Sequence, residues 1–71
     1  MIDFTNEIAV LIKLRRKQAG LTQMQLAEYA GVSKTVVFDI EHGKPTIQLD
    51  TLLKILRVLN IKLITDVSGV D

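Results

Sequence analysis

The sequence contains no cysteine, a single proline and a single histidine among its 71 residues. Without cysteine, neither a disulfide framework nor a thiolate metal site can support the fold. The histidine, His42, has no second ligand of the kind that a zinc site requires. Paired histidine and carboxylate groups and phosphate-cradling glycine loops, which mark many enzyme active sites, are also missing. We therefore expect no metal, no cofactor and no catalytic residue.

Long hydrophobic runs are absent as well. No stretch has the length and apolar character of a membrane span. The N-terminal segment, MIDFTNEIAVLIKL, carries acidic residues before a short apolar run, which is wrong for a secretory signal. A chain of this length forms one domain with a small core and has no room for a separate small-molecule sensing domain. These features predict a cytoplasmic protein with no membrane partner and no small-molecule ligand.

Charge of either sign is not in large excess, because the formal net charge is only +1. That value is low for a nucleic-acid binder judged on composition alone. The basic residues are nevertheless clustered at Lys13, Arg15, Arg16 and Lys17, whereas the acidic residues are scattered. Such a cluster can contact an anionic partner, or it can simply favour the C-terminal end of a helix.

The stretch from Thr22 to Glu41, TQMQLAEYAGVSKTVVFDIE, predicts two short helices joined by a tight turn. Thr22 and Gln25 have the spacing of a capping box, and Ser33 can cap the second helix. Gly31 stands where a chain that leaves a helix often needs a positive φ. Apolar residues at helical spacing define the inner faces: Leu26, Ala27, Ala30, Val37 and Ile40. Together these signals predict a helix-turn-helix.

The outward positions of the second helix are Lys34, Thr35, Val36, Phe38 and Asp39. An ordinary surface helix carries mostly Glu, Lys and Gln there. A cation, a hydroxyl, apolar groups and a carboxylate instead suit the base edges and thymine methyl groups of DNA, so we predict base contacts from all five. Two alternatives stay open. The pair of helices could be an αα-hairpin of any small bundle, and Phe38 could lie against protein rather than DNA.

The motif LTQMQLAEYAGVSKTVVFDIEHGK, preceded by LRRKQAG, resembles the helix-turn-helix regulators of the phage-repressor and Cro type, the XRE family. The resemblance implies an all-α, lambda-repressor-like fold of four to five helices, with the second motif helix in the major groove. It also implies a phosphate contact from Gln23 and a buried ion pair between Arg16 and Glu41. Further phosphate contacts are expected from Thr22, Ser33, His42, Lys44 and Lys17.

Apolar periodicity predicts one helix before the motif and one after it. The first should run from about Asn6 to Gln18, with Ile8, Leu11 and Ile12 inward. The loop at Pro45 leads into a helix that ends near Leu59. The apolar residues of this last helix exceed a single stripe. We expect Leu49, Leu52, Leu53 and Leu56 to close the core, and Ile55, Val58 and Leu59 to need another cover.

The segment Ile61–Val67 alternates like a β-strand and is rich in β-branched residues. The chain offers no second strand, and an isolated strand would leave its backbone groups unpaired. We therefore predict a two-fold homodimer joined by antiparallel copies of this strand. Its interface would comprise Ile55, Val58, Leu59, Ile61, Leu63, Ile64, Thr65 and Val67. The tail could alternatively stay extended and unpaired, or add to the sheet of another protein.

Four helices, the segment GKPT-x-x-LDTLLKILRVLN and one terminal strand resemble the HipB-like antitoxins. This resemblance implies a bacterial, nucleoid-associated repressor of its own operon, with double-stranded operator DNA and a HipA-like kinase toxin as partners. Two alternatives remain: a stand-alone regulator without a toxin, and a module that mainly neutralises the toxin. The expected organisation is a DNA-binding domain over 1–60 with its motif at 22–41, a dimerisation strand over 61–67, and a frayed tail over 68–71.

Overall fold

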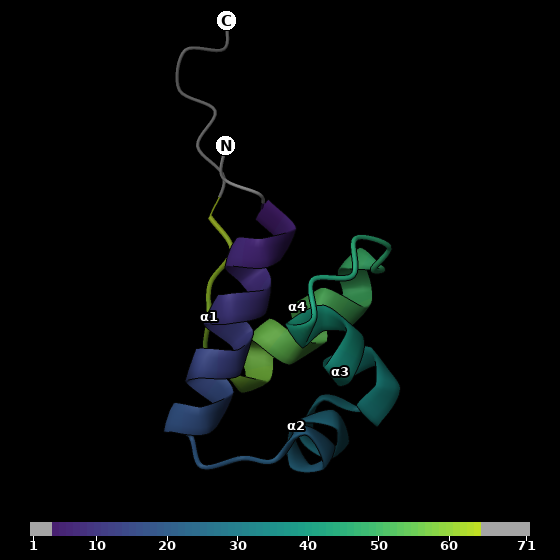
Figure 1. Ribbon diagram of the computed structural model, residues 1–71. Coiled ribbons are helices and arrows are strands. Elements are labelled where there is room, and N and C mark those ends of the chain that lie inside the picture. The colour runs from purple at the N-terminus through teal and green to yellow at the C-terminus, as the bar shows by residue number, and fades with distance from the viewer. Residues whose placement is uncertain (1–3, 65–71) are drawn as a thin grey trace, which may run out of the picture.

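The computed structural model describes residues 4–64, which form four α-helices and no β-strand within that range. The helices are α1 (Phe4–Gln18), α2 (Gln23–Ala30), α3 (Lys34–Glu41) and α4 (Leu49–Val58). α3 packs against α1 and α2, and α2 also packs against α4 (Figure 1). The predicted all-α architecture is confirmed. None of the helices in residues 4–64 combines the length and the apolar character needed to cross a bilayer.

Local hydrogen bonds cap the N-termini of α2 and α3, and a glycine ends α2. The backbone N–H of Gln25 donates to the Thr22 hydroxyl at 3.0 Å, and the Thr22 N–H donates back to the Gln25 side chain at 2.9 Å. At α3, the backbone N–H of Val36 donates to the Ser33 hydroxyl at 3.1 Å. Gly31 ends α2 with φ 72°, a conformation that glycine adopts without strain. Both predicted caps and the predicted glycine turn are confirmed.

The core lies where the four helices meet. α2 and α3 contribute the buried side chains that their periodicity predicted, and α1 contributes Ile12. The full core cluster is Ile12, Leu26, Ala27, Val37, Ile40, Leu52, Ile55, Leu56 and Leu59. Because the two motif helices share this core with α1 and α4, α3 is held rigidly with one face outward.

The predicted division of α4 into a core face and a dimer face was wrong. Ile55 and Leu59 are buried in the core of their own subunit, whereas Leu49 is 61% exposed and Leu53 is 37% exposed. The buried residues of α4 follow one stripe at helical spacing, Leu52, Ile55 and Leu56, which the C-cap residue Leu59 continues. Ile55 and Leu59 therefore cannot contact a second subunit without unfolding of the core. Val58 is partly buried against the same core.

The chain leaves α4 at Asn60, whose φ of 58° is the left-handed conformation that the sequence predicts there. The Ile61 N–H donates to the Leu56 carbonyl at 2.9 Å, and the Arg15 side chain donates to the Leu59 carbonyl at 3.3 Å. Residues 61–64 then run beside α1 (Figure 1) without strand pairing. The rest of the predicted strand, including Thr65 and Val67, lies outside the described residues, so the strand stays a prediction.

Candidate nucleic-acid interface

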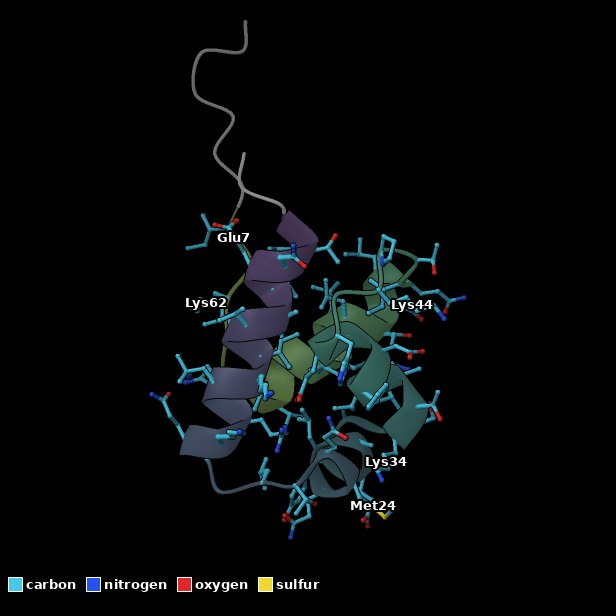
Figure 2. All side chains as sticks on the ribbon, viewed as in Figure 1. Glu7, Met24, Lys34, Lys44 and Lys62 are labelled. Atoms are coloured by element: carbon cyan, nitrogen blue, oxygen red, sulfur yellow. The ribbon has the colours of Figure 1, made fainter. Side chains whose placement is uncertain are left out.

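The inner face of α3 packs into the core, and this leaves its outer face exposed to solvent. Val37 and Ile40 are buried, while Lys34, Thr35 and Phe38 are exposed. Figure 2 shows Lys34 on the side of the molecule formed by α2 and α3, whereas Glu7 and Lys62 lie on the opposite side, along α1. The fold thus separates the helix-turn-helix surface from the surface made by α1 and the C-terminal segment.

An open hollow lies between the start of α2 and the outer face of α3. Its lining residues are Gln23, Lys34, Thr35 and Phe38. The structure therefore brings together three residues predicted to contact bases and one predicted to contact phosphate. An ammonium group, a hydroxyl and an aromatic ring that share one concave surface are suited to the mixed polar and apolar edge of a base pair. We refer to this surface as the α2–α3 hollow.

Phe38 and His42 form a stacked pair along the outer edge of α3. Their ring centroids are 3.9 Å apart and their planes meet at 23°. The Nδ1 atom of His42 lies 2.8 Å from the Phe38 carbonyl oxygen, and because a carbonyl can only accept, this bond assigns the proton to Nδ1. His42, predicted as a phosphate contact, is thus also a support for the Phe38 ring.

The other outward residues of α3 lie on a second side of the helix. The side chains of Asp39 and Lys44 form an ion pair at 3.4 Å, and the backbone N–H of Lys44 donates to the Asp39 backbone carbonyl at 3.0 Å. Both residues, together with Val36, line a separate hollow toward the α3–α4 loop. Val36 is partly buried and packs against the core while it also lines this hollow, so its predicted base contact stays a prediction. It lies at the edge of the inner stripe, beside Val37 and Ile40.

A buried ion pair connects α1 to the end of α3. The Arg16 guanidinium donates to both carboxylate oxygens of Glu41, at 2.6 and 3.0 Å. A third Arg16 N–H donates to the Leu21 carbonyl at 2.8 Å, which ties in the chain between α1 and α2. The two charged side chains are 10% and 1% exposed. Bidentate geometry of this kind is the strong form of an arginine–carboxylate contact.

Gln23 extends this network to the α2–α3 hollow. Its side-chain amide donates to Glu41 Oε1 at 3.1 Å. A glutamine amide carries a second N–H, which is not used in that bond. The predicted phosphate contact and the predicted ion pair are therefore parts of one hydrogen-bonded unit. No sequence pattern predicts this link, because the two residues belong to different helices.

The electrostatics of Glu41 follow from the same contacts. Burial alone would raise the pKa of the Glu41 carboxyl, because it disfavours the charged form. The hydrogen bonds from Arg16 and Gln23 and the positive charges of Arg16 and Lys13 outweigh burial and hold the pKa of Glu41 below its usual value. Glu41 is thus ionised at neutral pH, and the ion pair is intact.

The remaining residues predicted to contact phosphate differ in position. The hydroxyl oxygens of Thr22 and Ser33 accept the capping hydrogen bonds of α2 and α3, and each hydroxyl retains a proton to donate. Both residues stand at helix N-termini, where backbone dipoles favour anions. Lys17 is exposed in the last turn of α1 and lines neither hollow. Met24, which was not predicted, is exposed near Lys34 (Figure 2).

Comparison with known proteins gives consistent matches. The helix-turn-helix family matches residues 12–64. The HTH-type transcriptional regulator y4mF of Sinorhizobium fredii is 40% identical over 53 residues, which cover 75% of this chain and 70% of the relative. An HTH-type transcriptional regulator of Methanothermobacter thermautotrophicus is 36% identical over 61 residues, which cover 86% and 88%. A chain of the HipA–HipB–O2–O3 complex superposes with a TM-score of 0.82 at 28% identity, over 96% of both chains.

Proposed function

This chain belongs to the helix-turn-helix family of transcriptional regulators rather than to a family of enzymes, and from that premise we propose that it is a homodimeric repressor of a palindromic DNA operator. Each subunit inserts α3 into the major groove, and the two half-sites lie about one helical turn apart. The observation that carries the proposal is the α2–α3 hollow, where groups suited to bases adjoin a group suited to phosphate.

The proposed roles follow the position of each side chain. Lys34, Thr35 and Phe38 read bases, and Asp39 does so from the second side of α3. Phosphates are held around them by residues at helix ends and in the following loop: Gln23, Thr22, Ser33, His42 and Lys44. The phosphate contacts fix the register of the protein on the duplex, whereas the base contacts select the sequence. The buried pair of Arg16 and Glu41 keeps α3 in place.

The homodimer is proposed from the apolar surface near the end of the described chain. Leu53, Leu63 and Ile64 are all exposed large apolar residues, which a partner could cover. Pairing of two antiparallel copies of 61–67 would cover part of this surface and satisfy backbone groups that otherwise face water. Ile61 lines one hollow with Leu53, and Val58 is partly buried at the end of α4. Thr65 and Val67 belong to the part of the segment outside the described residues.

A HipA-like kinase toxin is the proposed protein partner, and repression of its own operon the proposed regulatory role. The support is the likeness over 96% of the chain to a subunit of the HipA–HipB–O2–O3 complex. The rival proposals are a stand-alone regulator and a module that chiefly neutralises the toxin. Coexpression with the product of a neighbouring kinase-like gene, followed by purification, separates the stand-alone regulator from the two proposals that include a toxin, and operator binding separates those two. A stable complex supports the toxin partner, and two proteins that separate support the stand-alone regulator.

The experiment that tests the proposal is binding to DNA just upstream of the chain's own gene, measured by fluorescence anisotropy at two salt concentrations. A random duplex of the same length is the control. Tight binding to the upstream DNA, with the random duplex weaker by orders of magnitude and a palindrome protected in a footprint, supports the operator. Equal and strongly salt-dependent binding to both duplexes would reveal phosphate attraction only and would overturn the proposal.

Lys34 provides the matching variant. Lys34→Ala should weaken operator binding by about 1–3 kcal/mol and relax the sequence preference, with little effect on the random duplex. An equal loss on both duplexes would make Lys34 a phosphate contact instead. Lys54→Ala is the control, because it removes the same charge from an exposed position on α4 outside the hollow. Sedimentation of both variants should give the mass of a dimer.

A further inference from the structure

Phe38 is an apolar ring on a helix face that otherwise presents polar groups. Phe38 is 47% exposed, although contact between an apolar ring and water is unfavourable relative to burial of the ring. The ring lies in the middle of the surface that faces DNA under the proposed function, on which this inference rests. A large apolar group in that position needs an apolar counterpart in the major groove.

The ring is held in place before any DNA arrives. His42 stacks on it at 3.9 Å between ring centroids. His42 is itself fixed by the bond from Nδ1 to the Phe38 carbonyl, 2.8 Å long. Each ring therefore restricts the rotation of the other. Ordering a side chain in advance lowers the entropy lost on binding, so a contact made by Phe38 is stronger than one made by a mobile side chain.

The surroundings of the ring point to a small ligand group beside a polar edge. Phe38 shares the α2–α3 hollow with Lys34 and Thr35, one helical turn earlier. In the major groove, the apolar group that base pairs of unmodified DNA present is the C5 methyl of thymine. Lysine, in contrast, pairs with the O6 and N7 acceptors of guanine. The hollow thus offers one surface for a methyl group and one for a guanine edge.

We propose that the Phe38 ring, supported by His42, is the receptor for one thymine methyl group in each half-site and a determinant of operator sequence. The spacing gives this assignment a register. Four residues of helix advance by about 6 Å, and successive base pairs are about 3.4 Å apart. The thymine read by Phe38 therefore lies within about two base pairs of the guanine read by Lys34.

The experiment uses an operator selected from random duplexes by the full-length chain. Each thymine is replaced in turn by uracil, which keeps the hydrogen-bonding edge and lacks the methyl. At one thymine position, replacement by uracil should weaken binding about fourfold when it is made in one half-site. Replacement in both half-sites should weaken binding about fifteenfold, because each half-site loses one buried methyl group. The other thymine positions should change affinity much less.

Variants assign the effect to the ring. In Phe38→Ala, thymine and uracil operators should bind equally, while binding stays specific through Lys34. Tyr29→Ala removes an aromatic ring that is 69% exposed and lies outside the hollow, so the wild-type ratio of thymine to uracil affinity should persist. His42→Ala should reduce the ratio without abolishing it, because the ring remains but is less ordered. Thermal unfolding of each variant checks that the fold is intact.

Other outcomes overturn the inference in distinguishable ways. Specific binding with no uracil effect, or a uracil effect unchanged in Phe38→Ala, refutes the methyl receptor and leaves the repressor standing. Failure to select any sequence refutes the proposed function itself. The same methyl group also occurs on 5-methylcytosine, so each cytosine is methylated in a parallel series. Stronger binding there that depends on Phe38, without a uracil effect, would overturn the assignment to thymine.

Discussion

Removal of the Glu41 carboxylate should destabilise the fold more than any single exposed contact does. Glu41→Ala leaves the Arg16 guanidinium without the acceptor of two of its hydrogen bonds. The Arg16 side chain is only 10% exposed, so bulk water has little access to the guanidinium when the carboxylate is removed. Its remaining bond, to the Leu21 carbonyl, holds the charge inside the protein. The variant therefore contains a buried and uncompensated positive charge.

The expected loss is about 3–5 kcal/mol, the usual result of removing one partner of a buried ion pair. Gln23 adds little to this figure, because its amide is partly exposed and can bond to water instead. A domain of this length has a total stability of about 4–11 kcal/mol at 0.05–0.15 kcal/mol per residue. Glu41→Ala should therefore lose about a quarter or more of the free energy of unfolding, and in the weaker part of that range it should not fold.

Urea denaturation followed by circular dichroism measures the change, at one protein concentration because the proposed dimerisation would shift the apparent stability. The control is Arg16→Met combined with Glu41→Leu, which replaces the pair by apolar side chains of similar volume. This double variant should regain most of the lost stability, since apolar replacements of buried ion pairs are often neutral. A loss below about 1 kcal/mol in Glu41→Ala would refute the reasoning, because it is the value of an exposed pair.

Three further outcomes are expected. Because the folded-state pKa of Glu41 is lowered, its contribution to stability is present above the unfolded pKa, near pH 4.5, and lost as pH falls through the folded value. Measurement of the free energy of unfolding as a function of pH should show that loss in the wild type. The double variant Arg16→Met, Glu41→Leu should not show it, and equal acid sensitivity of the two proteins would contradict the role of Glu41. Ile55→Ala should cost about 2–5 kcal/mol in urea denaturation, whereas Leu53→Ala at an exposed position should cost much less, and the reverse order would contradict the observed face of α4. Gly31→Ala should lower stability by about 1 kcal/mol, because alanine must adopt a left-handed φ of 72°; an unchanged urea midpoint would contradict this.

The motif itself could be predicted because its signals are local. The caps at Thr22 and Ser33 and the turn at Gly31 depend on residues within three positions of each other. Such contacts are set by residues close in sequence, so the sequence pattern alone indicates them. The outward direction of Lys34 and Phe38 followed from their spacing against the inner residues. The stack of Phe38 on His42 also has a local spacing, four residues, that brings side chains together on a helix.

The inner face of α4 could not be predicted in the same way. Its apolar residues cover most of the helix circumference, so periodicity allowed more than one stripe. Packing against α2 decides that Ile55 lies inside and Leu49 outside. Likewise, the bond between Gln23 and Glu41 joins residues 18 positions apart and depends on the angle between two helices. Sequence patterns do not encode that angle, and only the assembled fold reveals the link.

The attachment of α3 has an evolutionary consequence. The helix is held by its cap, its buried residues and the ion pair at Glu41, whereas Lys34, Thr35 and Phe38 contribute little to packing. These three positions can therefore mutate freely without loss of the fold. After a gene duplication, two paralogues could diverge in the sequences that they recognise while their subunits still pair under the proposed dimerisation. Cells with both genes would then contain mixed dimers that recognise hybrid sites, and a new regulatory connection could arise from a few substitutions.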